Sequence, residues 1–595
     1  MDRIAVLDFG GQYAHLIANR IRRVGVYSEI FHSDVSADAL KDFKGIIFSG
    51  GPQNISEDDS LKCDSKIFDL GIPILGICYG HQLTQYNFGG EISRGKTKEY
   101  GRSVLNIVKK VPLFEGLGSD EIMWMSHGDY VSKLGAGFEI IGSTEDCETA
   151  AVYNQEKNIY GIQFHPEVTH SVNGMKIFEN FVNLCDCKKS WDMNKFIEEE
   201  TSKIKEFVGD RNVFLLVSGG VDSNVCFALL NKALGSERVY GLHIDNGFMR
   251  LDESKKVEDK FREIGFDNFH VVDSSEVFLS KLIEKYEPEE KRKIIGHTFI
   301  DVQQEELAKL GLDPEKWVLG QGTIYPDTIE SGGTKNSKTI KTHHNRVEII
   351  EKLISEGKVI EPIKELYKDE VREVGKLLGL PDELIDRHPF PGPGLGVRCL
   401  CAKENFDASK DATKKSNEIA KENGLSAFVL PIKSVGVQGD ARTYNHPVAL
   451  FGGNGWDNYE KASIDITNNV EEVNRGVRLL SDTNLKNAKV VDSYLTRDRL
   501  DKLRIVDDIV SEFLKENNLY DKIWQFPVVL VPLSFEGGES IVLRPINSVD
   551  AMSASFSRID EELLKSLTEK IMAVEGVDAV FYDVTNKPPG TIEWE

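Results

Sequence analysis

The stretch VFLLVSGGVDS, residues 213–223, decides the fold of the middle of the chain. Its apolar run from Val213 to Val217 predicts a buried strand, and the residues from Asn224 to Leu234 predict a helix. The turn between them consists of Ser218, Gly219, Gly220, Val221, Asp222 and Ser223. A glycine-rich turn at a helix N-terminus offers backbone N–H groups and a favourable dipole to an anion. The stretch therefore predicts an α/β unit with a phosphate site, and a polar turn without a ligand is the alternative.

Asp222 adds a carboxylate to groups suited to phosphate, which makes sense if it holds a Mg²⁺ ion that bridges to the phosphates. The string SGGVDS resembles the signature of N-type ATP pyrophosphatases, which split ATP into AMP and pyrophosphate while adenylating a substrate. The resemblance implies a parallel-sheet domain of the adenine-nucleotide α-hydrolase type, with ATP bound at residues 218–223. Asp245, after the predicted strand from Val239 to Ile244, lies where nucleotides bind in open parallel sheets.

A kinase-type loop also exists by pattern, because GEISRGKT at residues 90–97 fits GxxxxGK[ST]. A P-loop needs a buried strand before it and a helix after it. Here a helical segment from Tyr79 to Phe88 precedes the pattern, and residues 98–103 read as extended. We therefore interpret the match as accidental.

Bulk composition limits the class of protein. A chain of 595 residues is too long for one core, which favours two to four domains. A net charge of −24 argues against binding to nucleic acid or an anionic membrane. Eight cysteines form no dense disulfide framework, and the first residues enter a strand without a signal-peptide pattern. We expect a cytoplasmic protein.

The first domain is predicted to be α/β with a mostly parallel sheet. Its expected strands are Ile4 to Leu7, Gly45 to Phe48, Pro73 to Ile77 and Ile159 to Phe164. Gly76-Ile-Cys78-Tyr-Gly80 has the GxCxG form of a nucleophile elbow, which pushes a thiol out of the sheet at a helix N-terminus. A buried cysteine without a role is the alternative for Cys78.

The partners of a thiol nucleophile follow later in the chain. His165 stands at the end of a predicted strand, and Glu167 is the next residue but one. A histidine can take the thiol proton and a carboxylate can fix its tautomer. The backbone N–H groups near Gly51 and at Tyr79 are candidates for an oxyanion site.

The set GGP, GICYGHQ and QFHPE resembles the class I glutamine amidotransferases over the first third of the chain. The resemblance implies a flavodoxin-like fold in which Cys78 attacks the glutamine amide and His165 and Glu167 complete the triad. It also implies that Gly51 and Tyr79 form the oxyanion site and that Gln82 contacts glutamine. We assign His81 no catalytic role.

Four more motifs lie downstream, at residues 319–327, 340–345, 368–372 and 387–396. Together with SGGVDS they resemble the family of glutamine-hydrolysing GMP synthases over nearly the whole chain. The resemblance implies a ligase that aminates XMP to GMP, with glutamine as nitrogen donor and AMP and pyrophosphate as by-products. The rival interpretations are another glutamine-dependent adenylating amidotransferase and a non-catalytic sensor of glutamine or nucleotide.

The same resemblance implies a third, α+β domain that binds XMP. Its candidate XMP contacts are Arg292, Asp440, Gln525, Lys587 and Glu593. We expect domains at residues 1–190, 191–398 and 399–595. Residues 445–520 are longer than in compact bacterial members, whose C-terminal domain dimerises, so a homodimer is one expectation and the oligomeric state stays open. The charged helical run from Arg497 to Asn517 is either a solvated face or an interface.

Overall fold

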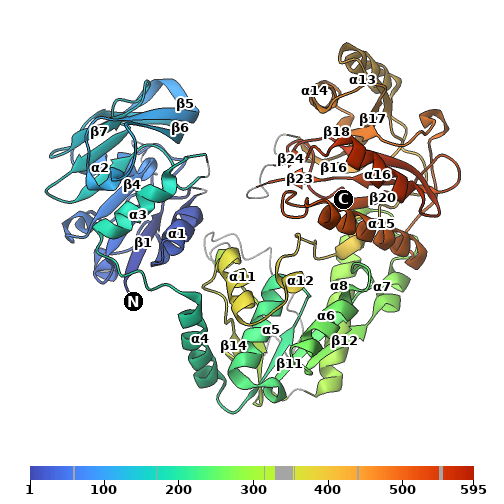
Figure 1. Cartoon of the computed structure of the whole chain (residues 1–595), viewed down its shortest axis with the longest axis horizontal. Helices are drawn as coiled ribbons and strands as arrows, with labels where there is room; N and C mark the ends of the chain where they lie inside the picture. Colours follow the sequence, from blue (N-terminus) through green and yellow to red (C-terminus); the bar gives the residue numbers. More distant parts are fainter. Residues whose placement is uncertain are drawn as a thin grey trace. The chain divides into compact units, whose positions relative to one another are not determined.

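The computed structural model divides into two compact units, residues 1–199 and 200–595 (Figure 1). It describes the chain except residues 12, 56, 58–59, 169, 312, 314, 328–352, 354–355, 439–440 and 549–553. The predicted histidine-pair motif at 340–345 lies outside the described residues, as does Asp440. Among the described residues, every helix is too short or too polar to cross a bilayer. The predicted three-domain division stays a prediction.

The first unit is built on a nine-stranded sheet of order β2-β1-β3-β4-β9-β8-β7-β5-β6. The first five strands in this order are parallel: β2 (Tyr27–His32), β1 (Arg3–Asp8), β3 (Gly45–Phe48), β4 (Ile74–Ile77) and β9 (Ile159–Ile162). The others pair antiparallel: β8 (Ala151–Asn154), β7 (Glu139–Ser143), β5 (Glu91–Ile107) and β6 (Asp120–Lys133). The four predicted strands are confirmed, but a mostly parallel sheet is wrong for the second half.

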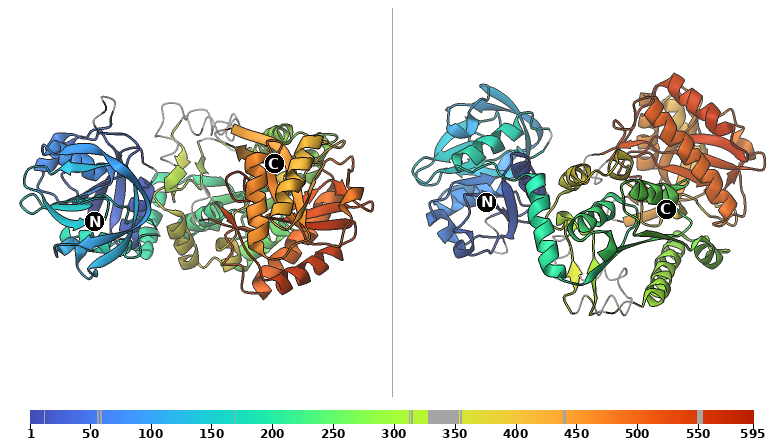
Figure 2. Two further views of the ribbon diagram at one scale, coloured as in Figure 1. Left: turned by 90° about the horizontal axis from the view of Figure 1, so that it is seen from above. Right: turned by 60° about the horizontal axis from the view of Figure 1, so that its bottom comes forward.

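Helices α1 (Ala14–Arg23), α2 (Tyr79–Asn87) and α3 (Gly174–Leu184) cover this sheet. All residues of β3, β4 and β9 are buried, as expected of central parallel strands. The GxxxxGK[ST] match lies in the turn after α2 and in β5, a strand paired with β6. Its interpretation as an accidental P-loop match is therefore confirmed. α4 (Met193–Val208) leads into the second unit (Figure 2).

The second unit contains a five-stranded, fully parallel sheet of order β12-β11-β10-β13-β14. Its strands are β10 (Asn212–Leu216), β11 (Val239–Asp245), β12 (Phe269–Asp273), β13 (Trp317–Gly320) and β14 (Val359–Ile360). Its helices are α5 (Val221–Leu234), α6 (Glu253–Glu263), α7 (Ser275–Lys281), α8 (Pro288–Leu310), α11 (Lys368–Leu377) and α12 (Asp382–Ile385). The predicted strand, turn and helix at residues 213–234 are therefore present.

The same unit contains a seven-stranded mixed sheet of order β15-β17-β18-β25-β22-β20, with β16 paired to β17. The strands are β15 (Ser426–Val429), β16 (Ser434–Gln438), β17 (Ala441–Phe451), β18 (Val473–Leu479), β20 (Val528–Val531), β22 (Glu539–Leu543) and β25 (Val577–Asp583). Two parallel pairs, β17 with β18 and β22 with β25, meet where β18 pairs antiparallel with β25. Each pair is connected through one long helix, α14 (Trp456–Asn469) or α16 (Glu561–Met572).

The segment at 445–520 is therefore part of a central sheet, to which it contributes β18 and most of β17. It also contains α15 (Arg497–Glu516), whose apolar face, including Leu503, Val510 and Phe513, is buried in the core. The apolar face of the charged run therefore packs in the core, and the alternatives of a solvated face and an interface stay predictions for its charged side. The remaining elements are α13 (Lys410–Glu422), the short strands β19 (Lys489–Val490), β21 (Leu533–Ser534), β23 (Ile546–Asn547) and β24 (Ser555–Phe556), and the 3₁₀ turns Ala37–Leu40, Ser65–Asp69, Pro112–Phe114, Ser236–Arg238, Gly394–Val397 and Leu485–Asn487.

Candidate active sites

The turn between β4 and α2 holds Cys78 in a strained conformation. Its φ of 52° and ψ of −104° are unusual for a residue with a side chain. The flanking glycines allow the close packing that such a turn needs. A Cβ on Gly76 would lie 2.5 Å from the carbonyl oxygen of Gly80, and a Cβ on Gly80 would lie 2.5 Å from Phe48. The predicted elbow is present, with the thiol at the N-terminus of α2.

His165 and Glu167 lie beside this thiol. His165 Nδ1 is 2.7 Å from Glu167 Oε1, and the Glu167 side chain is fully buried. A Cβ on Gly50 would lie 3.1 Å from His165 Cε1 and 3.7 Å from Cys78 Cβ, so the two side chains flank the same glycine. Burial lowers the pKa of His165, but Glu167 and the hydrogen-bonded Cys78 thiol raise it well above its ordinary value. The structure brings the three predicted triad residues together.

The predicted oxyanion donors lie next to the thiol. Tyr79 is the first residue of α2, so its N–H has no acceptor within the helix. The backbone of Gly51 packs close to Phe9, because a Cβ on Gly51 would lie 2.6 Å from the Phe9 carbonyl oxygen. That Cβ would also lie 3.2 Å from the Tyr79 ring. Gly51 thus packs against Tyr79, the residue that follows Cys78 in the elbow.

Gln82 belongs to a chain of amide hydrogen bonds that reaches the thiol. Its Nε2 donates to the Asp129 carbonyl oxygen at 2.8 Å and to Gln163 Oε1 at 3.1 Å. Gln163 Nε2 in turn lies 3.5 Å from Cys78 Sγ. Gln163 stands within the QFHPE motif, but the motif alone indicated no role for it. His81 packs beneath the elbow against β9, and burial lowers its pKa to about 3.

A second buried pair, which was not predicted from the sequence, supports the same segment of β6. His127 Nε2 is 3.0 Å from Glu99 Oε2, and His127 Nδ1 is 3.1 Å from the Asp129 carbonyl oxygen. A carbonyl only accepts, so His127 Nδ1 is the donor to Asp129. Burial raises the pKa of Glu99, but hydrogen bonds from His127, Ser103 and Thr144 lower it below its ordinary value. SHGD at residues 126–129 was the available sequence signal.

The glycine-rich turn at residues 218–223 connects β10 to α5. Gly219 has a φ of 81°, and Gly220 is the N-cap of α5. The hydroxyl oxygens of Ser218 and Ser223 lie 3.1 Å apart, and Ser223 donates to the Gly220 carbonyl at 3.0 Å. Ser218 and Gly220 are exposed. The turn is thus open to solvent at a helix N-terminus, as a phosphate site requires.

Charged groups surround this turn. Lys368, from α11, contacts both carboxylate oxygens of Asp222 at 2.6 and 2.7 Å. Arg387 donates to the Gly219 carbonyl at 2.6 Å and pairs with Glu253, while burial beside Arg250 lowers its pKa to about 10. Lys368 and Arg387 both stand in motifs named above, but the sequence indicated no role for either.

Asp222 and Asp245 are the carboxylates predicted for the nucleotide site. Asp245 ends β11, the neighbour of β10, and accepts a hydrogen bond from the Gly247 N–H at 2.9 Å. In the described part of the chain, no cluster of three or more His, Cys, Asp or Glu side chains could hold a metal. Mg²⁺ beside a nucleotide commonly needs only one or two carboxylates plus phosphate oxygens. The donor set at the turn therefore fits such an ion.

The predicted XMP contacts that lie in the described part of the chain are spread over the second unit. Arg292 in α8 donates to the Glu595 backbone oxygen, and Gln525 Nε2 donates to the Pro389 carbonyl at 2.8 Å. Lys587 pairs through its backbone with Ala554. Both carboxylate oxygens of Glu593 accept from Arg398, at 2.8 and 3.0 Å. Arg398 is fully buried, and the sequence indicated no role for it.

Comparisons with known proteins found relatives of the whole chain and of its parts. A family model for class I glutamine amidotransferases matches residues 5–185, and one for the C-terminal domain of GMP synthase matches residues 512–594. A probable glutamine-hydrolysing GMP synthase of Leptospira interrogans is 46% identical over 602 residues, covering 100% of this chain and 99% of its own. A glutamine-hydrolysing GMP synthase of Bacillus cereus is 44% identical and covers 80% of this chain and 96% of its own. The crystal structure of a putative GMP synthase component from Thermoplasma acidophilum is 33% identical over 31% of this chain and 94% of its own, with a TM-score of 0.30.

Proposed function

The chain belongs to the family of glutamine-hydrolysing GMP synthases, and we propose here which of its residues perform each part of the reaction. The enzyme makes GMP from XMP with ATP and a nitrogen atom taken from glutamine. The C2 oxygen of the xanthine ring is a poor leaving group, so ATP first converts it to an adenylate. Ammonia then displaces AMP.

In the proposed glutaminase step, the Cys78 sulfur attacks the side-chain amide carbon of glutamine. His165 accepts the thiol proton and passes it to the departing ammonia, and Glu167 keeps the imidazole oriented. The N–H groups of Gly51 and Tyr79 stabilise the oxyanion, and Gln82 contacts the glutamine. Water then hydrolyses the thioester to glutamate. The strained Cys78 backbone and the 2.7 Å contact between His165 and Glu167 support these roles.

In the proposed adenylation step, residues 218–223 hold the pyrophosphate of ATP. The backbone N–H groups of the turn and the N-terminus of α5 stabilise the charge that develops when the bond to the α-phosphate breaks. Asp222 would hold Mg²⁺, which would neutralise negative charge on the phosphates. Lys368 contacts Asp222 at this turn and is proposed to contact the same phosphates, and Asp245 lies at the neighbouring strand end.

XMP is proposed to contact Arg292, Asp440, Gln525, Lys587 and Glu593. A cation suits the phosphate, and amide or carboxylate groups suit the ribose and base. We also propose that the enzyme is a cytoplasmic homodimer. It is proposed to act without binding nucleic acid or a membrane. Light scattering on the purified protein measures the mass that decides between monomer and dimer.

The observation that carries the proposal is the Cys78 elbow beside the paired His165 and Glu167. We expect Cys78→Ala to abolish glutamine-dependent GMP synthesis and to keep synthesis from added ammonium, because the second site stays intact. Asp222→Ala should stop both. The assay measures XMP-dependent release of AMP and pyrophosphate. Unchanged glutamine use by Cys78→Ala would contradict the elbow assignment, and formation of ADP would contradict the adenylation step.

A further inference from the structure

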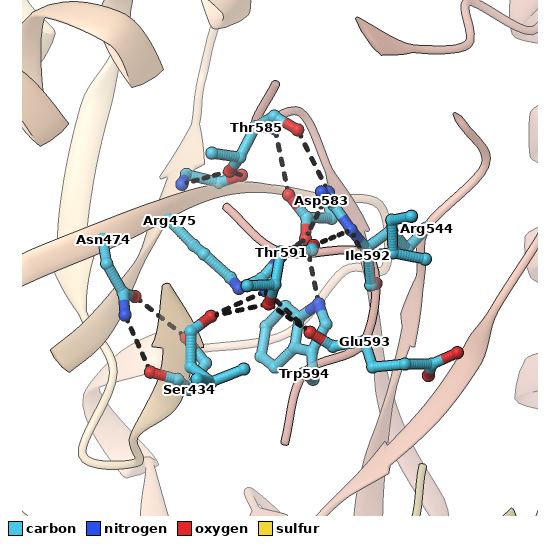
Figure 3. A network of polar contacts seen from close by, with 12 residues as sticks. Ser434, Asn474, Arg475, Arg544, Asp583, Thr585, Thr591, Ile592, Glu593 and Trp594 are labelled. Atoms are coloured by element: carbon cyan, nitrogen blue, oxygen red, sulfur yellow. Dashed lines mark hydrogen bonds and ion pairs between the residues drawn. The ribbon is translucent and has the colours of Figure 1, made fainter. Parts of the chain in front are cut away.

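Three fully buried charged side chains meet at one end of the seven-stranded mixed sheet (Figure 3). Asp583 ends β25, and Arg475 and Arg544 come from the neighbouring strand β18 and the end of β22. One carboxylate oxygen of Asp583 lies 2.9 Å from Arg475 and 2.8 Å from Arg544. Two cations thus share one carboxylate. Burial beside Arg544 lowers the pKa of Arg475 to about 9.

Arg475 Nη2 and Arg544 Nε hold the backbone of residues 591–593, while Arg475 Nη2 also donates to the Val435 carbonyl and Arg544 Nη1 to the Thr585 carbonyl. Arg475 Nη2 donates to the Glu593 carbonyl at 3.0 Å and to the Thr591 hydroxyl at 2.6 Å. Arg544 Nε donates to the carbonyl oxygens of Thr591 at 2.9 Å and Ile592 at 3.1 Å. Three successive carbonyl groups are therefore fixed by two side chains. Figure 3 shows both guanidinium groups directed at this segment.

Residues on either side of this segment strengthen the same arrangement. Trp594 Nε1 donates to Asp583 at 2.9 Å, and the Arg475 guanidinium lies 5.1 Å from the Trp594 ring centre. A Cβ on Gly590 would lie 3.1 Å from Arg475 Nη1, so the backbone packs directly against the guanidinium. The segment has little freedom to shift along its own direction.

The Glu593 side chain is held at its other end as well. Its carboxylate accepts two hydrogen bonds from the fully buried Arg398, while its backbone carbonyl is held by Arg475. Buried ionic networks add little net stability compared with apolar packing of similar volume. What this network supplies is a fixed position for the backbone of residues 591–593, because the planar guanidinium group of arginine binds several acceptors at once.

We propose that Arg475, Arg544 and Asp583 are positioning residues for XMP, which fix the backbone of residues 591–593 and so set where the Glu593 carboxylate meets the nucleotide. They act through Glu593 and not on XMP itself. The inference rests on the proposed role of Glu593 in binding XMP. It adds a set of buried residues, far apart in sequence, on which recognition of XMP depends.

The test compares XMP and ATP kinetics in two variants of the full-length enzyme. Arg475→Lys keeps the positive charge but loses the fork, and we expect the KM for XMP to rise about tenfold. Thr591→Val removes one hydroxyl from the network and leaves both arginines in place, and its KM for XMP should rise about threefold. In both, the KM for ATP and the glutaminase rate should stay within about twofold of the wild type. Calorimetric titration with XMP alone should show the same loss of affinity.

Arg478→Lys is the matched control, because Arg478 lies on the same strand but makes its two 2.8 Å contacts with Glu561 on α16. It should leave the KM for XMP unchanged. The inference is overturned if folded Arg475→Lys and Thr591→Val bind XMP like the wild type, or if all kinetic constants worsen together with the melting temperature. If Arg475→Lys does not fold, Thr591→Val decides alone. A wild-type enzyme that makes no GMP from XMP would overturn the proposed function itself, whereas active wild type with unaltered variants overturns only the positioning role.

Discussion

Cys78, His165 and Glu167 show how three side chains alter one another's chemistry. Glu167 and the Cys78 thiol both raise the pKa of His165, against the effect of burial. A pKa raised in the folded state contributes stability that is fully present below the unfolded value of about 6.5 and is lost as the pH rises through the folded pKa. The imidazole therefore stays protonated to a higher pH in the folded enzyme than in the unfolded chain.

We predict that Cys78→Ala lowers the pKa of His165, because it removes one group that raises it. Glu167→Gln should lower this pKa further, since the Glu167 charge is the largest of the raising influences. NMR titration of the His165 Cε1–H signal measures both shifts. A His165 signal that titrates identically in the wild type and Cys78→Ala would contradict the coupling of thiol and imidazole.

Gly80 is the residue at which the elbow tolerates no side chain. A Cβ there would lie 2.5 Å from both the Cβ and the carbonyl oxygen of Phe48. We predict that Gly80→Ala destabilises the first unit by about 2 kcal/mol or more, as overpacking against backbone does. Denaturant unfolding measures this loss. Gly118→Ala is the control, because the nearest atom to its added Cβ is a flexible Glu121 oxygen at 3.4 Å.

The triad residues were predictable from sequence because each lies in a short motif at the end of an apolar strand. Gln163, Arg387 and Arg398 were not, although each stands in or beside a motif named above. Their roles depend on contacts with residues far away in the chain, such as Arg398 with Glu593, 195 positions later. A local pattern carries no information on such a partner.

At the scale of elements, the predicted sheet differs from the observed one in the antiparallel strands β8, β7, β5 and β6, which include the long β5–β6 hairpin. The parallel strands were predictable because their residues are continuously apolar and buried. β5 and β6 are long and partly exposed, and β6 alternates buried and open positions. These two strands pair with each other in antiparallel orientation, and their sequences contain no continuous apolar run by which they could be predicted. The expectation of a mostly parallel sheet was wrong for that reason.

This hairpin carries the buried pair of Glu99 and His127 behind the glutaminase site. We predict that Glu99→Gln lowers the glutaminase kcat/KM about tenfold, because His127 loses its charged partner and the Asp129 carbonyl loses its fixed donor. Synthesis from added ammonium should be unchanged. Rates of GMP synthesis measured with glutamine and with ammonium show whether only the glutamine-dependent reaction is slowed.

The control for this variant is Glu91→Gln, on the same strand, where Glu91 pairs with Lys133 in an exposed contact of 2.6 Å. It should leave both rates unchanged. Equal glutamine-dependent rates in Glu99→Gln and the wild type would show that the pair does not support the site. Because the pKa of Glu99 is lowered, its contribution to stability is present above its unfolded value and is lost as the pH falls through the folded pKa.

At the scale of the whole molecule, the two units have separate hydrophobic cores. One cluster, with Leu7, Phe48 and Leu83, lies within residues 1–199, and the others lie within residues 200–595. We predict two transitions in calorimetric unfolding. Gly80→Ala should lower only one of them, and saturating XMP should raise only the other, since a ligand stabilises the part that binds it. A single transition that both treatments move would contradict independent unfolding of the units.

The central position of β25 has a consequence for how the protein is made. β18 leaves the ribosome first, β22 follows, and β25 arrives last, yet it lies between them in the sheet. Arg475 is synthesised 108 residues before Asp583, the carboxylate that it contacts. Until Asp583 is synthesised, the Arg475 guanidinium has no buried counter-charge, so its free energy is lower in water than in the protein interior. During translation, β18 and β22 of the seven-stranded sheet therefore stay unpaired on the sides that face β25. The sheet is completed only when β25 has been synthesised and pairs with both strands.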